Sequence, residues 1–264
     1  MKVILKVESS PMRNSHTSLL RLLILICGLL LVTPGLYAQE LTYFALQREG
    51  QASVAVDKSK KAAYIIDLGR GGDGDQMKLD NLPLLDRLEQ SGIEDLFFVC
   101  SHPHSDHMGG IRALFRQPRL FFRDEQLTNP RFKSITIVDD GVANNLYLML
   151  QRALAGNRRI KVTHLSATNR NAFAGISSKA DEVYVETLPY PTALRPSVHG
   201  KAVITYIILG QQNSIIDFDD ADSATIKKVV ESLKARGITK IRAFVVPHHG
   251  SKYHEIAPIL ELRP

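Results

Sequence analysis

The sequence predicts an α/β fold, and three observations support this. Segments with strand composition alternate along the chain with segments in which apolar residues recur at helical spacing. One strand segment, at 201–209, is a near-continuous apolar run, typical of a buried strand. A dense run of histidine and aspartate, residues 102–107, stands where a strand segment passes into a helical one. Sites in layered α/β folds gather at that end of the strands.

Residues 1–38 have the layout of a secretory signal peptide. An apolar run from Leu22 to Val32 follows basic residues, and the small residue Ala38 precedes Gln39. The run is shorter than the roughly 20 residues that a membrane-spanning helix needs. We therefore expect a signal peptide at 1–38, a single mature domain at 39–264 without a stable membrane span, and a secreted or periplasmic location. An uncleaved N-terminal anchor is the alternative.

The composition is that of an ordinary globular chain, with 44% hydrophobic and 23% charged residues. Residues 1–38 contribute +3 to the formal net charge of +6, from four basic side chains against one acidic one. The +3 that remains is too small to indicate nucleic-acid binding by itself. After removal of the leader, Cys100 would be the one cysteine left, so no intrachain disulfide is expected.

The first half of the mature chain is predicted to begin with strands at 41–46, 53–56 and 62–66. A helix is predicted between Pro83 and Gly92, because proline is common in a first helical turn and glycine is common just past a helix end. A short apolar strand at 96–100 follows. This strand, helix, strand order is typical of a βαβ unit.

The second half is predicted to alternate in the same way. Strands are expected at 135–138, 158–162, 182–188, 201–209, 214–216 and 241–246. Helices are expected at 142–154 and from Asp222 or Ser223 to Gly237. Basic residues gather around the second of these strands, namely Arg152, Arg158, Arg159, Lys161 and Arg170. A solvated face is the simpler interpretation of these residues, and phosphate contact is the alternative.

The histidine and aspartate run has the chemistry of a metal site. An extended backbone places His102 and His104 on the same side, so they can bind one ion together. Asp106 and His107 are adjacent and point differently in a first helical turn, which suits a second ion. Imidazole and carboxylate are Zn²⁺ ligands, and Mn²⁺ or iron accepts them too. A chance polar loop is the alternative, disfavoured because the chain has only 9 histidines.

Three stretches resemble the metallo-β-lactamase superfamily. His-Pro-His-Ser-Asp-His at 102–107, followed by Met-Gly-Gly, is similar to the HxHxDH signature of that superfamily. Ile-Ile-Asp-Leu-Gly at 65–69 is similar to the strand end that precedes the signature, and Val-Pro-His-His-Gly-Ser at 246–251 resembles a motif of the ComEC-type branch. The resemblance covers residues 41–254. It implies a four-layer αββα sandwich.

The resemblance also implies a set of ligands for two Zn²⁺ ions, with Mn²⁺ or iron as alternatives. The first ion would be held by His102, His104 and His199, the second by Asp106, His107 and His249, and Asp220 would bridge the two. Asp219 is the alternative bridge, because the Thr-Gly-Asp of the family is Phe218-Asp219-Asp220 in this chain. His199 is the histidine available near the right place, and a plain loop histidine is the alternative for it.

The resemblance implies a hydrolase that uses a metal-activated hydroxide, with Asp106 orienting the nucleophile and His248 protonating the leaving group. The ComEC-type motif favours a phosphodiesterase or nuclease that acts on a small-molecule or nucleic-acid substrate. Hydrolysis of a lactone, β-lactam or thioester is the alternative. A module that binds metal without catalysis is a third, because the glycine of Thr-Gly-Asp is missing here and the chain stops soon after the last motif. Gly-Gln-Ala-Ser at 50–53, which replaces the Gly-Gln-Gly-Asp of the family, is a further departure.

Overall fold

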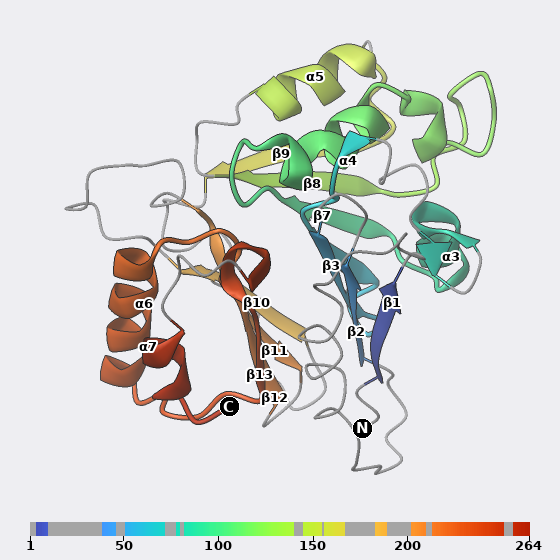
Figure 1. The fold of residues 1–264 in the computed structure, drawn as a ribbon. Helices are drawn as coiled ribbons and strands as arrows, with labels where there is room; N and C mark the ends of the chain where they lie inside the picture. Colours follow the sequence, from blue (N-terminus) through green and yellow to red (C-terminus); the bar gives the residue numbers. More distant parts are fainter. Residues whose placement is uncertain are drawn as a thin grey trace.

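The structure of the chain is a computed structural model, drawn in Figure 1. It describes residues 4–9, 39–45, 51–71, 78–79, 82–139, 145–154, 156–166, 183–188, 202–209, 213–250 and 256–264.

The larger sheet has seven strands in the order β1-β2-β3-β4-β7-β8-β9. The strands are β1 (Ile4–Ser9), β2 (Gln39–Ala45), β3 (Gln51–Asp57), β4 (Ala62–Ile66), β7 (Asp95–Val99), β8 (Ser134–Asp139) and β9 (Lys161–Ser166). β2, β3 and β4 are antiparallel neighbours, whereas β4, β7, β8 and β9 run parallel. The helices α3 (Leu84–Gln90), α4 (Ser105–Phe115) and α5 (Asn145–Ala153) connect the parallel strands in turn. The carboxyl ends of these strands therefore share one edge.

The smaller sheet has four strands in the order β10-β11-β12-β13. They are β10 (Val183–Leu188), β11 (Ile204–Leu209), β12 (Asn213–Asp217) and β13 (Ala243–Val245). The helix α6 (Ser223–Ala235) joins β12 to the parallel strand β13, and α7 (Ala257–Leu260) follows the 3₁₀ turn η4 (Pro247–Gly250). A two-stranded ribbon of β5 (Lys78–Leu79) and β6 (Leu82–Pro83) and the 3₁₀ turn η2 (Pro118–Phe121) complete the described elements.

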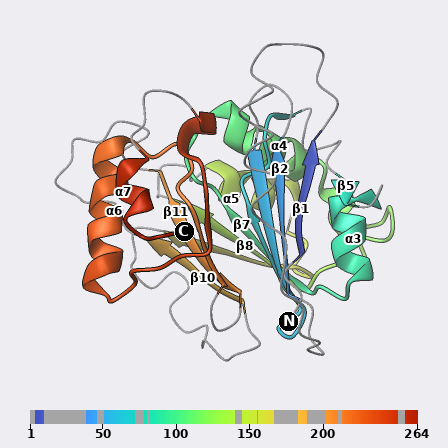
Figure 2. The same ribbon diagram turned by 60° about the horizontal axis from the view of Figure 1, so that its bottom comes forward.

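Three apolar clusters separate four layers. The alternation of side chains along β4 shows this, because Ile65 packs with the helices α3, α4 and α5 while Tyr64 and Ile66 pack toward the smaller sheet. A third cluster joins the smaller sheet, through residues such as Ile216, to α6 and α7, through residues such as Val230. Figures 1 and 2 show the two sheets between these two groups of helices. The predicted four-layer αββα arrangement is confirmed.

Most of the predicted elements are present, and two differences have physical causes. β9 begins at Lys161 rather than Arg158, because the Asn157 side chain accepts from the backbone of Arg159 and holds a turn before the strand. β5 and β6 are two residues each, too short to give a period in the sequence. The strand β1 lies inside the predicted leader and pairs with β2. The signal peptide stays a prediction. In the described part of the chain, no helix has the length and apolar character to cross a membrane.

The loop that follows β4 packs directly on the start of α4. The backbone of Leu68 donates to the His107 carbonyl at 2.8 Å, and Gly110 donates to the Gly69 carbonyl at 2.8 Å. Gly109 lies at the closest point, because a Cβ built on it would be 2.6 Å from the Gly71 nitrogen. The glycine after the histidine cluster therefore has a packing role: it lets this loop reach the helix.

We expect Gly109→Ala to lower the free energy of unfolding by about 2 kcal/mol, although alanine is the better helix former by about 1 kcal/mol. The added methyl group would meet backbone atoms, which cannot move aside as a flexible side chain can. Denaturant unfolding of the purified chain measures the change. Gly71→Ala is the matched control, since its Cβ would come no closer than 3.5 Å to a neighbour. Equal stability of the two variants would contradict this interpretation.

Candidate metal centre

The site lies where the ends of strands from both sheets meet. Asp67 follows β4, Ser101 follows β7, and Asp217 ends β12, and all three are buried. The backbone of Val203, just before β11, donates to the Ser101 carbonyl at 2.8 Å and so joins the two sheets at this point. Buried polar groups at such an edge need partners, because each unsatisfied group costs roughly 1–3 kcal/mol.

The start of α4 sets the directions of the predicted ligands. His104 is the N-cap with extended dihedral angles, φ −69° and ψ 151°, and its carbonyl accepts from the backbone of His107 and Met108. Asp106 and His107 are thereby placed in the first helical turn, as predicted. His102 and His104 precede the helix, with ring centroids 4.5 Å apart. One short segment thus brings three imidazole rings and a carboxylate together.

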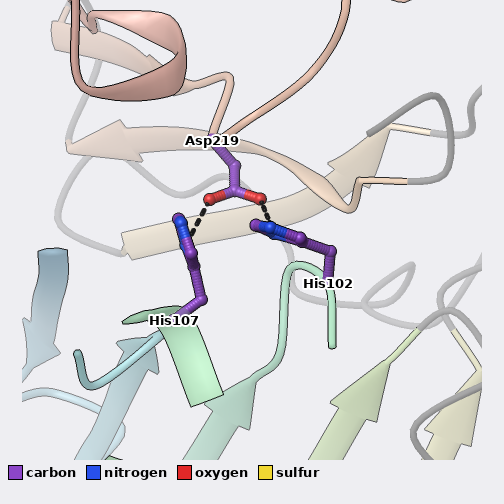
Figure 3. A group of neighbouring side chains, drawn as sticks. All are labelled: His102, His107 and Asp219. Atoms are coloured by element: carbon purple, nitrogen blue, oxygen red, sulfur yellow. Dashed lines mark hydrogen bonds and ion pairs between the residues drawn. The ribbon is translucent and has the colours of Figure 1, made fainter. Parts of the chain in front are cut away.

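The Nδ1 atoms of His102 and His107 face one carboxylate, that of Asp219, as Figure 3 shows. His102 Nδ1 lies 2.9 Å from Asp219 Oδ2, and His107 Nδ1 lies 2.8 Å from Asp219 Oδ1. The two rings come from the loop after β7 and from α4, whereas Asp219 lies in the turn after β12. A ring that donates from Nδ1 presents its Nε2 lone pair on the other side.

The Nε2 atoms of the same two histidines face Asp220. His102 Nε2 lies 3.5 Å from Asp220 Oδ2, and His107 Nε2 lies 3.4 Å from Asp220 Oδ1. Two ligands on a tetrahedral ion with bonds of 2.0–2.1 Å would be about 3.3–3.4 Å apart. His102, His104 and Asp220 also offer ligand atoms that all lie within 4.8 Å of one another. The donors and their spacing fit a divalent ion.

Asp106 and His248 border this group. Asp106 Oδ2 lies 4.0 Å from His107 Nε2, and His248 Nε2 lies 3.9 Å from Asp220 Oδ2. The His248 side chain is 30% exposed. The backbone of His248 donates to the Asp219 carbonyl at 2.9 Å, so the 3₁₀ turn η4 and the turn after β12 hold each other in place. A partly exposed imidazole beside a buried carboxylate is suited to exchanging protons with a bound substrate.

Further polar side chains support the carboxylates. Asp67 accepts from the backbone and hydroxyl of Ser101 at 2.9 and 2.6 Å, and its Oδ2 lies 2.8 Å from His107 Nδ1. Gln51 donates to Asp219 Oδ1 at 2.9 Å, and Ser53 donates to Asp217 Oδ2 at 3.0 Å. No role at the site was predicted for Asp67, Gln51 or Ser53. Two features of the sequence could have indicated them. Asp67 belongs to the strand-end motif at 65–69, and Gln51 and Ser53, at the start of β3, belong to the segment 50–53 that differs from the family.

The charges of the site compensate one another. Burial alone would raise the pKa of Asp219, but His107 and His102 hold it well below the ordinary value. Burial would lower the pKa of His107, yet Asp219 and Asp67 raise it above the usual range of imidazole. The pKa of His102 is raised as well, because Asp219 outweighs the effect of burial. Asp219 is therefore an ionised carboxylate, and it stabilises positive charge on both imidazole rings.

Two further carboxylates and one histidine of the site also have shifted pKa values. Burial, followed by the charges of Asp219 and Asp67, raises the pKa of Asp217 to about 7. Burial and the charge of Asp219 raise the pKa of Asp67 against the opposing effect of His107. Burial and the charge of His102 lower the pKa of His104, which favours the neutral ring that a metal needs. A dication among these groups would relieve the repulsion between the acids.

Some predicted site residues lie outside what the structure describes. His199 is not among the described residues, and for His249 only the backbone is described. The ligand roles of both stay predictions. Asp220, rather than the alternative Asp219, faces the Nε2 atoms. His164 lies 3.1 Å from the buried Asp139 and stacks on Tyr147, away from the candidate ligands.

The basic stretch lies away from the site. Lys161 pairs with Ser134 at the start of the parallel strands, whereas the site lies beyond their other end. Five residues of strand, roughly 16 Å, separate the two ends. Arg159 donates to the Thr128 carbonyl at 2.6 Å. Arg170 lies outside the described residues. The described basic residues therefore have a structural and solvent-exposed setting rather than a place beside the candidate ligands.

Comparison with known proteins gives one sequence match. Residues 47–119 match the family model of the Metallo-beta-lactamase superfamily. No curated protein sequence matches the chain. Among solved structures, the crystal structure of human tRNase Z, short form (ELAC1), aligns with 13% identity and a TM-score of 0.36, covering 69% of this chain and 68% of that chain. The chain is thus similar to the metallo-β-lactamase superfamily over the segment that carries Asp67, His102, His104, Asp106 and His107.

Proposed function

We propose that this chain is a divalent-metal-dependent hydrolase with a binuclear centre. The observation that carries the proposal is the convergence of His102 Nε2 and His107 Nε2 on the two oxygens of Asp220, at 3.5 and 3.4 Å. His102, His104 and Asp220 would hold one ion, with His107 and Asp106 beside a second. The superfamily match covers the four of these residues that lie on and before α4.

The ions would supply a lowered pKa for water and a polarised bond in the substrate. The chain supplies the remaining steps. Asp106, at the rim of the group, would accept a hydrogen bond from the attacking water. His248 would give a proton to the leaving group; its Nε2 lies 3.9 Å from Asp220 and its ring is partly exposed, which supports this role.

A phosphodiester is the substrate class we favour. Support comes from the resemblance of residues 246–251, which include His248, to the ComEC-type motif. The basic stretch lends no support, because its described residues lie at the far end of the sheet. A lactone, β-lactam or thioester is the second candidate class. The leader-like composition of residues 1–38 supports a secreted or periplasmic location.

Removal of metal is expected to lower hydrolysis of bis-p-nitrophenyl phosphate by at least about a hundredfold, and added Zn²⁺ or Mn²⁺ to restore it. Elemental mass spectrometry of the full chain should find close to two ions per chain. His102→Ala should lose metal and activity together. His164→Ala is the matched control, a histidine paired with a buried aspartate outside the site, and it should keep both. Single-stranded DNA serves as the second phosphodiester substrate.

Nitrocefin and a panel of lactones separate the two substrate classes. Turnover of these compounds with phosphodiesters left intact would overturn the phosphodiester assignment and leave a hydrolase. Bound metal without turnover of any substrate would overturn the enzyme assignment and favour a metal-binding module.

A further inference from the structure

Asp219 has a backbone conformation that favours glycine. Its φ is +51°, in the left-handed region that side chains with a Cβ adopt at a cost. The metallo-β-lactamase superfamily, which this chain resembles, has glycine at this place in Thr-Gly-Asp, where this chain has Phe218-Asp219-Asp220. Aspartate is tolerated in this region better than most residues. A carboxylate at a glycine-like position therefore calls for an explanation in its contacts.

The contacts of Asp219 join three parts of the chain. Asp219 Oδ2 lies 2.9 Å from Nδ1 of His102, which is 117 residues away along the chain. Asp219 Oδ1 lies 2.8 Å from His107 Nδ1 and accepts a hydrogen bond from Gln51 at 2.9 Å. The side chain is 1% exposed. Asp220, the next residue, faces the Nε2 atoms of the same rings. The two consecutive aspartates thus meet both rings on opposite edges.

We propose that Asp219 is a positioning residue that holds the proton on Nδ1 of both histidines at once, so that both Nε2 atoms are presented to the ions together. This inference rests on the metal-binding part of the proposed function. A hydrogen bond to the outer nitrogen of a ligand histidine fixes its tautomer and orientation, and its loss typically weakens metal binding 10–100-fold. In this chain, one carboxylate serves two ligands.

The two histidines do not depend on Asp219 equally. His107 Nδ1 also lies 2.8 Å from Asp67 Oδ2, so an ionised Asp67 can accept a charge-assisted hydrogen bond from it. His102 Nδ1 lies 3.1 Å from the hydroxyl of Ser101, which is a weaker partner. Loss of the Asp219 charge should therefore disturb the Nδ1 hydrogen bond of His102 more than that of His107.

Asp219→Asn tests this with little change in shape. An amide has one acceptor oxygen, so it can serve one ring, and its NH₂ group would face the other. That ring would then favour the proton on Nε2, where it blocks the metal. We expect zinc affinity, measured by chelator competition on the full chain, to fall 10–100-fold. Asp139→Asn, which alters a buried aspartate paired with His164, is the control and should leave zinc affinity unchanged.

Long-range ¹H–¹⁵N spectra of the zinc-loaded protein provide a readout that a purely structural role would not move. Wild-type protein should show zinc on Nε2 and a proton on Nδ1 for both histidines. In Asp219→Asn, His102 should lose this pattern and His107 should keep it. If Asp219→Asn does not fold, Asp219→Gly replaces it, because glycine suits the observed φ and also removes the carboxylate.

Wild-type zinc affinity and ring pattern in the variant would overturn the role of Asp219 and leave the proposed hydrolase standing. Weakened zinc binding in the variant, together with a wild-type protein that binds zinc and hydrolyses nothing, would support Asp219 and overturn the hydrolase. A wild-type chain that binds neither Zn²⁺ nor Mn²⁺ would overturn both.

Discussion

Asp220→Ala is expected to remove metal from the centre and to lower kcat/KM for the phosphodiester by more than the roughly 10–100-fold that outer-shell residues typically contribute. Asp220 is buried and meets His102 Nε2 and His107 Nε2 with separate oxygens. Alanine would leave both rings without the carboxylate between them. Metal content by elemental mass spectrometry and steady-state kinetics measure the two effects on the same preparation.

Asp222→Ala is the control for Asp220→Ala. Asp222 is the N-cap of α6, and its side chain accepts from the backbone of Thr225 at 2.8 Å. Its replacement should lower stability by about 1 kcal/mol and leave metal content unchanged. Two ions retained by Asp220→Ala would show that this carboxylate is not a shared ligand.

Asp67→Ala is expected to lower the free energy of unfolding of the metal-free chain by about 3 kcal/mol. Asp67 is buried and accepts from the backbone and hydroxyl of Ser101, while His107 Nδ1 lies 2.8 Å away. The substitution strands these donors in a buried place where water does not replace the carboxylate. Denaturant unfolding in the presence of a chelator measures the loss without a contribution from metal.

Asp124→Ala is the matched control for Asp67→Ala. Asp124 also accepts a backbone bond, from Thr128 at 2.7 Å, but this pair is exposed to solvent. Its replacement should lower stability by less than about 1 kcal/mol. A comparable loss in the two variants would mean that burial adds nothing to the Asp67 contacts.

The residues close together in sequence were predictable, and those brought together by packing were not. The spacing of His102, His104, Asp106 and His107 predicts their grouping, since an extended segment followed by a helix fixes their directions locally. Gln51 meets Asp219 across 168 residues, and Ser53 meets Asp217 across 164. Such contacts depend on how two sheets pack, which no local period encodes.

The fold shows the same division. Apolar runs predict single strands such as β4 and β7, but the four layers came from the resemblance, because periodicity does not say which sheet a strand joins. The basic stretch is a further case. Its composition suggested phosphate contact, and only the parallel pairing of β8 with β9 shows that Lys161 lies at the end opposite the site. Likewise, Asp219 faces the Nδ1 atoms of the two histidines and Asp220 faces their Nε2 atoms, and composition does not report which aspartate lies on which side.

The joining of the two sheets at Ser101 and Val203 has a consequence for how the stability of the folded chain depends on its ion. The candidate ligands come from both sides of that seam: residues 102–107 lie on one side, and Asp220 lies more than a hundred residues further along the chain. The unfolded polypeptide therefore does not hold the complete group together. An ion at a hundred times its dissociation constant would then add about 2.7 kcal/mol to stability by mass action. Scarcity of the ion would thus lower the folded population and expose the chain to proteases.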